Sequence, residues 1–394
     1  MKTIYVDNNA TTQVSPEVLE VMLPYFREAY GNPSSMHTFG GDVAADISRA
    51  REKVAALINA EPKEISFTSC GTESDSTAIW ATIEAFPERK HIITSRVEHP
   101  AIKSLYEGLS KKGYRVTFVP VDHQGRLDLD YLYGNLEDQT ALVSIMWANN
   151  ETGVIFLIDD ISREVKSRGI VFHSDAVQAV GKLHIDVDKT AVDMLSISGH
   201  KFHAPKGIGA LYIRKGTKYS PFLIGGHQEK GRRGGTENTA SIIGLGKAAE
   251  LAKKHLEDNG YERIKGWRDK LETALLETVS NTMINGDPEN RLPNTTSIAF
   301  EYVEGEAILL MMNEHGICAS SGSACTSGSL EPSHVLRAMG VPFTAAHGSI
   351  RFSLSRYNTA DEMDFIAEKL PPIIKTLRGL SPFWKEATEL KAQS

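Results

Sequence analysis

Residues 65–85 read ISFTSCGTESDSTAIWATIEA, in which a short apolar run leads through a small polar turn into a helical pattern. We expect a strand over residues 65–69 and a helix that begins at about Glu73. Similar β-branched runs recur at residues 91–96, 115–120, 141–146, 169–173, 194–198 and 209–214. Alternation of such runs with longer helical patterns predicts an α/β fold around a mostly parallel sheet of the seven-stranded type.

The pattern changes after about residue 240. A charged, helix-rich stretch over residues 241–278 is followed by expected strands at 296–300 and 350–354, with helices between and after them. Thr359 and Glu362 have the spacing of a capping box, which marks the start of the last helix. We therefore predict a large domain over residues 15–258 and a smaller α+β domain formed by residues 1–14 and 259–394.

Charge balance and cysteine content argue against several classes of protein. The chain has 43 Lys and Arg against 50 Asp and Glu, a net charge of −7, which argues against a nucleic-acid-binding surface. Its three cysteines form no CxxC pair, so we expect neither a disulfide framework nor a metal site, and a reducing compartment. The N-terminal residues lack a signal-peptide layout, and the apolar stretches are too short to span a bilayer. We expect a cytoplasmic protein with no membrane partner.

Chemically reactive residues follow several of the expected strands, where ligand sites of α/β sheets lie. Gly71 and Thr72 lie in the turn after residues 65–69, where N–H groups at a helix start can bind a phosphate. Thr72 could equally be a helix N-cap. Asp175 follows residues 169–173, and a buried carboxylate needs a cation such as a protonated pyridine nitrogen, unless it only caps the next helix.

Lys201 ends the segment SGHK directly after the strand expected at residues 194–198. Burial lowers the pKa of a lysine from about 10.4 toward neutrality, which makes the amine a nucleophile that can form a Schiff base. Lys206 is its rival, but the Pro-Lys-Gly setting of Lys206 is typical of an exposed turn. His99 and Asn150 follow two further strands, and each alone could be an ordinary histidine or turn residue. Together these residues supply an anion site, an acid, an amine, an aromatic base and an amide.

The ordered set of motifs resembles the class V aminotransferase group of fold-type-I pyridoxal-phosphate enzymes, and more narrowly the cysteine desulfurases. The likeness covers nearly the whole chain. It rests on YVDNNATT (5–12), GNPSS (31–35), TES (72–74), EH (98–99), NNE (149–151), DAVQ (175–178), SGHK (198–201), GGHQE (225–229) and RGGT (233–236).

The resemblance implies roles for individual residues around the cofactor pyridoxal 5'-phosphate. Lys201 binds the cofactor covalently, Asp175 pairs with its ring nitrogen, and His99 stacks on the ring and serves in proton transfer. The chain is expected to form a homodimer in which Thr236 reaches the phosphate bound by the neighbouring subunit. Further cofactor contacts are implied for Gly71, Thr72, Asn150, Gln178, Ser198 and His200.

Cys325 lies in SSGSACTSGS (320–329), a run of small residues with no side chain suited to packing. Such a segment is flexible and exposed, so a cysteine placed there is more often functional than structural. A free thiol is mostly protonated at neutral pH, and His99 is the natural base to activate it. Cys318 is expected to be a small buried core residue, whereas Cys70 lies in the predicted phosphate turn.

Arg351, in SIRFSL (349–354), matches the family arginine that binds the substrate carboxylate, with Asn150 as a second substrate contact. A bidentate guanidinium suits that task. Arg356 is its competitor, but Arg356 falls at the end of the expected strand.

The resemblance implies a cysteine desulfurase, which takes sulfur from L-cysteine, releases L-alanine and holds a persulfide on Cys325. The loop sequence is most similar to the nitrogen-fixation branch, which supplies sulfur for nitrogenase metalloclusters. An iron–sulfur cluster scaffold protein is therefore the expected acceptor, and Cys325 could contact a cluster during transfer. The alternatives are a selenocysteine lyase, another class V enzyme such as a small-substrate aminotransferase, and a non-catalytic scaffold protein.

Overall fold

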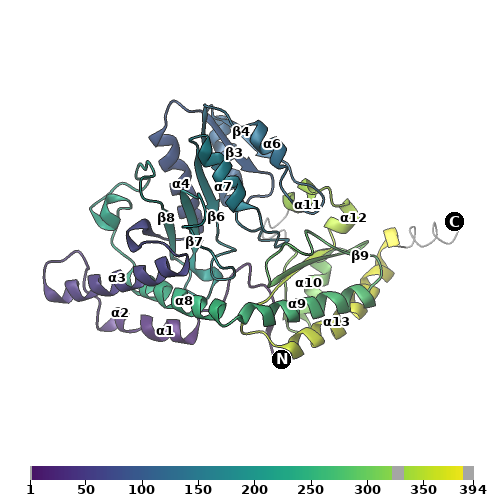
Figure 1. Cartoon of the computed structure of the whole chain (residues 1–394). Coiled ribbons are helices and arrows are strands. Elements are labelled where there is room, and N and C mark those ends of the chain that lie inside the picture. Colours follow the sequence, from purple (N-terminus) through teal and green to yellow (C-terminus); the bar gives the residue numbers. More distant parts are fainter. Residues whose placement is uncertain (1, 322–331, 385–394) are drawn as a thin grey trace.

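A mixed sheet of seven strands forms the centre of the larger part of the molecule (Figure 1), in the order β2-β8-β7-β6-β5-β3-β4. The computed structural model describes residues 2–321 and 332–384. β8 runs antiparallel to both of its neighbours, and the other pairs are parallel. The predicted α/β fold is therefore confirmed. The strands are β2 (Ile65–Thr68), β3 (His91–Ser95), β4 (Arg115–Val119), β5 (Thr140–Ser144), β6 (Val171–Asp175), β7 (Met194–Ser198) and β8 (Gly209–Ile213).

Helices cover both faces of this sheet because successive strand residues point to opposite sides. On β3, Ile92 packs in the apolar cluster that contains α4 (Gly71–Ala85) and α5 (Pro100–Lys111). Its neighbour Ile93 belongs to the cluster on the other face, with α3 (Thr38–Leu57), α7 (Ile158–Ser167) and α8 (Thr239–Glu257). Shorter helical segments are α1 (Pro16–Met22), α2 (Pro24–Arg27), α6 (Leu129–Gly134), and the 3-10 turns η1 (Pro62–Glu64), η2 (Gly199–Lys201) and η3 (Gln228–Gly231).

A separate apolar cluster lies around a three-stranded antiparallel sheet in the order β12-β10-β9. Ile4 and Val6 from the N-terminus belong to this cluster, and β1 (Ile4–Tyr5) pairs in parallel with β11 (Ile317–Cys318). The first described residues of the chain therefore share a core with β12 and α13, although the domain boundaries at residues 14/15 and 258/259 stay predictions. The remaining elements are β9 (Thr282–Ile284), β10 (Thr295–Phe300), β12 (Ser349–Ser353), α9 (Gly260–Thr278), α10 (Gly305–Asn313), α11 (His334–Ala338), α12 (Phe343–Ala346) and α13 (Ala360–Leu380).

Local boundaries differ from the sequence predictions in three places. Helix α4 begins at Gly71 rather than Glu73, with Cys70 at the N-cap position, so Thr72 is not the N-cap. Strand β6 continues to Asp175 instead of ending at residue 173, which places this carboxyl group within the sheet. The stretch 241–278 is two helices, separated at Asn259, whose φ of 53° is incompatible with a continuous helix. The capping box of Thr359 and Glu362 is confirmed at the start of α13.

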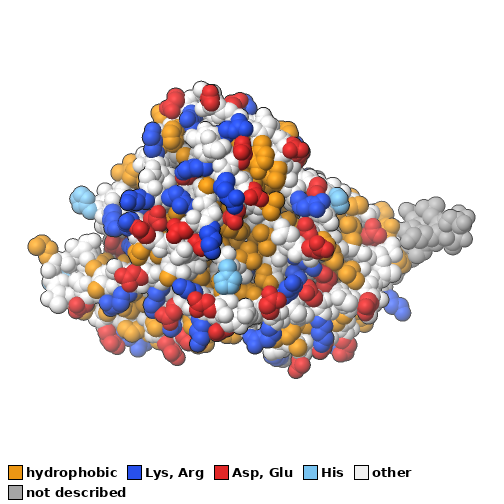
Figure 2. All heavy atoms as spheres, in the orientation of Figure 1, with side chains coloured by type: hydrophobic (Ala, Val, Ile, Leu, Met, Phe, Trp, Pro, Cys, Tyr) orange, Lys and Arg blue, Asp and Glu red, His pale blue; other side chains and the backbone are white. Residues whose placement is uncertain are grey.

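The surface carries both charge signs. Figure 2 shows Lys and Arg side chains interspersed with Asp and Glu over the visible face. Within residues 2–321 and 332–384, no helix is long and apolar enough to cross a membrane. The same residues contain no cluster of three or more His, Cys, Asp or Glu side chains suited to holding a metal ion.

Candidate active site

A cavity of about 290 Å³ opens at the carboxyl ends of the parallel strands and the start of α4. It brings together residues that are more than a hundred positions apart in sequence, which is the arrangement expected of a ligand site in an α/β sheet. Nine of the predicted cofactor residues line it: Gly71, Thr72, His99, Asn150, Asp175, Gln178, Ser198, His200 and Lys201.

Lys201 is held directly after β7, at the end of η2. Its Nζ donates to the backbone carbonyls of Asn9, at 2.7 Å, and Ala10, at 2.9 Å. Burial and the nearby Arg351 guanidinium lower the pKa of Lys201 to about 8, against the opposing effect of the Asp175 carboxylate. The amine is thus much closer to its nucleophilic, neutral form than an ordinary lysine. Lys206, the rival, is exposed, as the sequence predicted.

The lowered pKa of Lys201 predicts how the cofactor-free protein captures pyridoxal phosphate. Only the neutral amine attacks a carbonyl, so the capture rate should rise about tenfold per pH unit up to pH of about 8 and then level off. Stopped-flow absorbance at a series of pH values measures this rate. A rate that keeps rising toward the ordinary lysine pKa of about 10.4 would contradict the assignment.

Asp175 lies at the end of β6 and is 5% exposed. One carboxyl oxygen accepts from the Val177 backbone N–H at 2.9 Å. Burial raises the pKa of Asp175 to about 6, although the Val177 hydrogen bond and the Lys201 charge favour its ionised form. A carboxylate that is buried without a full ion-pair partner is suited to holding a cationic ring nitrogen.

The other end of the cavity is suited to a phosphate. Gly71 is the first residue of α4, a helix of 15 residues, so the positive end of the helix faces the cavity. A Cβ at Gly71 would lie 2.8 Å from Cγ2 of Val177, which explains why glycine stands there. Ser198 and Thr72 add hydroxyl groups to the same lining. With an amine, a buried acid and an anion site in one cavity, the described residues fit pyridoxal phosphate.

His99 caps α5 with its own side chain. Its Nδ1 accepts from the Ala101 backbone N–H at 3.1 Å. His99 is exposed to the open cavity, but the protein atoms packed around its ring and the Lys201 charge lower its pKa to about 4, so the ring is neutral at physiological pH. A neutral ring that accepts at Nδ1 carries its proton on Nε2. His99 is therefore set up to donate a hydrogen bond, and accepting a thiol proton at Nδ1 requires that its contact with Ala101 break.

Two buried acids at this site, Asp75 and Glu98, were not predicted from the sequence, and Asp75 lines the cavity. Glu98 accepts from the Ser95 hydroxyl at 2.7 Å and the Met146 backbone N–H at 3.0 Å, which ties the end of β3 to the segment after β5. Burial raises the pKa of Glu98 to about 8 and that of Asp75 well above its usual range. Glu98 directly precedes His99 and Asp75 lies three residues after Thr72, positions that could have indicated both from the sequence.

Arg351 is on β12, 2% exposed, and does not line the cavity. Its guanidinium donates to Asp7 at 2.6 Å and to the backbone carbonyl of Asn150 at 2.9 Å. The predicted inward position is therefore observed, but the partner is a carboxylate of the chain itself. Arg356 lies after the strand and donates to the Ser15 hydroxyl at 2.9 Å, away from the cavity.

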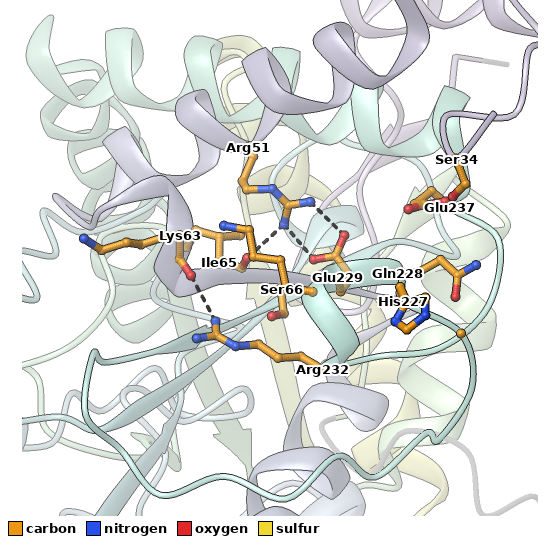
Figure 3. A pocket seen from close by; sticks show the side chains of 12 residues that line it. Ser34, Arg51, Lys63, Ile65, Ser66, His227, Gln228, Glu229, Arg232 and Glu237 are labelled. Atoms are coloured by element: carbon orange, nitrogen blue, oxygen red, sulfur yellow. Dashed lines mark hydrogen bonds and ion pairs between the residues drawn. The ribbon is translucent and has the colours of Figure 1, made fainter. Parts of the chain in front are cut away.

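Thr236 does not line the cofactor cavity. It follows the segment around Glu229, which is bonded to strand β2. Figure 3 shows a second cavity, of about 460 Å³, in which Arg51 forms a bidentate ion pair with Glu229, at 2.6 and 2.7 Å. Glu229 also accepts from the Phe67 backbone N–H at 3.0 Å. These contacts hold the start of the segment that carries Thr236, whose role in a neighbouring subunit stays a prediction.

The structure describes two of the three cysteines, Cys70 and Cys318. Cys325 lies outside the described residues. Cys318 is half-buried rather than a fully buried core residue, because the short strand β11 exposes one side. Cys70 is also half-buried and lines the cofactor cavity, and no role is assigned to it.

Comparison with known proteins agrees with this geometry. Residues 4–366 match the Aminotransferase class-V family, and the chain belongs to that family of pyridoxal-phosphate-dependent enzymes. A cysteine desulfurase of Trichormus azollae is 58% identical over 394 residues, covering 100% of this chain and 98% of the relative. The cysteine desulfurase NifS of Azotobacter vinelandii is 57% identical over 385 residues, covering 98% and 96%. A solved NifS-like protein superposes with a TM-score of 0.89 at 40% identity, covering 95% of this chain and 100% of that structure. Within the class-V family the chain is thus a member of the cysteine desulfurases.

Proposed function

We propose that the chain removes sulfur from L-cysteine, releases L-alanine and holds the sulfur as a persulfide on Cys325. The observation that carries this proposal is the single cavity that gathers Lys201, Asp175 and His99 in a chain 58% identical to a cysteine desulfurase over its full length. When bound, pyridoxal phosphate supplies an electron sink for negative charge that develops at the substrate α-carbon.

Four side chains carry out the other steps of the proposed reaction. Arg351 exchanges its contact with Asp7 for the substrate carboxylate, and the Lys201 amine, with its pKa of about 8, removes the α-proton. Asp175 balances positive charge on the ring nitrogen of the cofactor. The Cys325 thiolate then attacks the substrate sulfur, so that an S–S bond forms as the Cβ–S bond breaks. The electron pair of that bond stays with the carbon skeleton, which is protonated and leaves as L-alanine.

The wider role that we propose is sulfur supply for iron–sulfur clusters of the nitrogen-fixation type, which the likeness to NifS supports. The acceptor is an iron–sulfur cluster scaffold protein, and the active form is a homodimer to which Thr236 of each chain contributes. We also propose a cytoplasmic location, since half-buried free thiols persist in a reducing compartment.

Product analysis tests the proposed reaction. The cofactor-loaded protein is incubated with L-cysteine and a reductant, and alanine, sulfide, pyruvate and ammonia are measured. Equal amounts of alanine and sulfide are expected. Pyruvate with ammonia would indicate β-elimination, and transfer of the amino group to a keto acid would indicate an aminotransferase. Either result would overturn the proposal.

Arg351→Lys should raise the KM for L-cysteine about tenfold or more while changing kcat less. Lysine keeps the charge but loses the second parallel hydrogen bond to a carboxylate, and a charge-assisted bond contributes about 1.5–3 kcal/mol. Steady-state kinetics measures both constants. Arg356→Lys is the matched control, because Arg356 donates to Ser15 away from the cavity. Equal effects of the two substitutions would contradict the assigned carboxylate contact.

A further inference from the structure

Lys182 is a buried lysine without a function in the mechanism above. It is 4% exposed, and within residues 2–321 and 332–384 it forms no ion pair. Its Nζ donates to two side-chain oxygens, Oε1 of Gln178 at 2.7 Å and Oδ1 of Asn9 at 3.0 Å. Burial of a lysine is costly, so its place in the turn segment four residues beyond the cavity-lining Gln178 calls for a physical reason.

The contacts of Lys182 are those of a hydrogen-bond donor. Among the described residues its Nζ has two acceptors, Oε1 of Gln178 and Oδ1 of Asn9. Burial and the positive charges of Lys201 and Arg351 hold the pKa of Lys182 well below its usual range. Lys182 therefore serves here as a hydrogen-bond donor to two side-chain oxygens.

These contacts determine how Gln178 is oriented. Oε1 of Gln178 accepts from Lys182, and Nε2 donates to the backbone carbonyl of Asn9 at 2.9 Å. If the amide turned over, its oxygen would face the Asn9 carbonyl, which is a repulsive contact, and Oε1 would lose the hydrogen bond that Lys182 donates to it. Among the described residues, the second N–H of Gln178 Nε2 has no acceptor in this orientation, and the side chain lines the cofactor cavity.

We propose that Lys182 is a positioning residue that makes Gln178 present an N–H donor, and never its carbonyl oxygen, to the bound cofactor. The preferred ligand group at this point is an ionised oxygen on the ring of pyridoxal phosphate. The same network fixes Asn9, whose backbone carbonyl accepts from both Gln178 and Lys201.

Lys182→Met tests this proposal, because methionine fills similar space and offers no donor. Without Lys182, Oε1 of Gln178 loses its donor and only the Asn9 carbonyl still favours the observed orientation, so the turned-over amide becomes more populated. The affinity for pyridoxal phosphate should fall about tenfold, and the pH midpoint of the visible absorbance of the bound cofactor should rise by about one unit. Equilibrium dialysis and an absorbance titration, both without cysteine, measure these quantities. They do not depend on the reaction proposed above.

A double-mutant cycle shows whether Lys182 acts through Gln178. In a Gln178→Leu background, Lys182→Met should change neither the affinity nor the midpoint further. The matched control is Lys189→Met, at a lysine whose side chain is 81% exposed, and it should leave both values unchanged. An unaltered spectrum and affinity in Lys182→Met, or an equal shift in the Gln178→Leu background, would overturn the proposal.

A second variant that keeps one donor tests the proposal even if Lys182→Met does not fold. Lys182→Gln can still donate to Oε1 of Gln178, so its midpoint and affinity should lie between those of wild type and Gln178→Leu. Values for Lys182→Gln beyond those of Gln178→Leu would also contradict the proposed action through the amide. Circular dichroism of the cofactor-free variants verifies the fold.

Discussion

Lys201→Ala should lower alanine formation by about 10³-fold or more and abolish the visible absorbance of cofactor held through this side chain. The substitution removes the amine that captures the cofactor and takes the α-proton. It also removes the two hydrogen bonds to the Asn9 and Ala10 carbonyls, which hold the N-terminal segment at the cavity. Absorbance after addition of pyridoxal phosphate and alanine release from L-cysteine measure the two effects.

Lys206→Ala is the control for this prediction. Lys206 lies on the same connection between β7 and β8 but is exposed, so its removal should leave absorbance and rate close to wild type. Cofactor absorbance that survived in Lys201→Ala and vanished in Lys206→Ala would reverse the assignment. The buried position and lowered pKa of Lys201 argue for the assignment as stated.

Cys325→Ala should reduce alanine formation by at least about 100-fold, which corresponds to ~2.7 kcal/mol of barrier, while cofactor absorbance stays as in wild type. The reason is the balance of electrons in the Cβ–S cleavage. Cleavage of the Cβ–S bond with retention of its electrons on carbon leaves the sulfur needing an electron pair, and a thiolate is the group that supplies it.

The other two cysteines provide the controls for Cys325. Cys318→Ala should retain activity, because Cys318 lies on β11 away from the cofactor cavity. Cys70→Ser tests whether the half-buried thiol in the cavity lining can substitute as nucleophile. Full alanine formation by Cys325→Ala would favour a selenocysteine lyase, an enzyme for which a thiol on the loop is not required.

Much of the cofactor site could be predicted from the sequence because its residues directly follow strands. The β7 boundaries were predicted as observed, and Lys201 lies three residues beyond Ser198. A parallel sheet brings all carboxyl ends to one edge, so residues that are distant in sequence had to converge there. Asp175 illustrates the limit, since the sequence placed it after a strand that in fact contains it.

The remaining features depend on contacts that short motifs do not encode. Lys182 lies four residues after Gln178, a spacing that allows contact, but its burial depends on Asn9 from the other end of the chain. The pairing of Arg351 with Asp7 likewise depends on where the N-terminal segment lies. The half-exposed state of Cys318 could not be predicted, because its apolar neighbours in sequence indicated a core position.

Transfer of labelled sulfur tests the central claim most directly. The cofactor-loaded protein receives one equivalent of sulfur-labelled L-cysteine without reductant, is alkylated at once, and is digested for peptide mass mapping. The proposed mechanism predicts label on the Cys325 peptide in an amount equal to the alanine released, and loss of that label after reduction. Alanine released with all label free in solution, or with label on the Cys70 peptide, would contradict persulfide formation at Cys325.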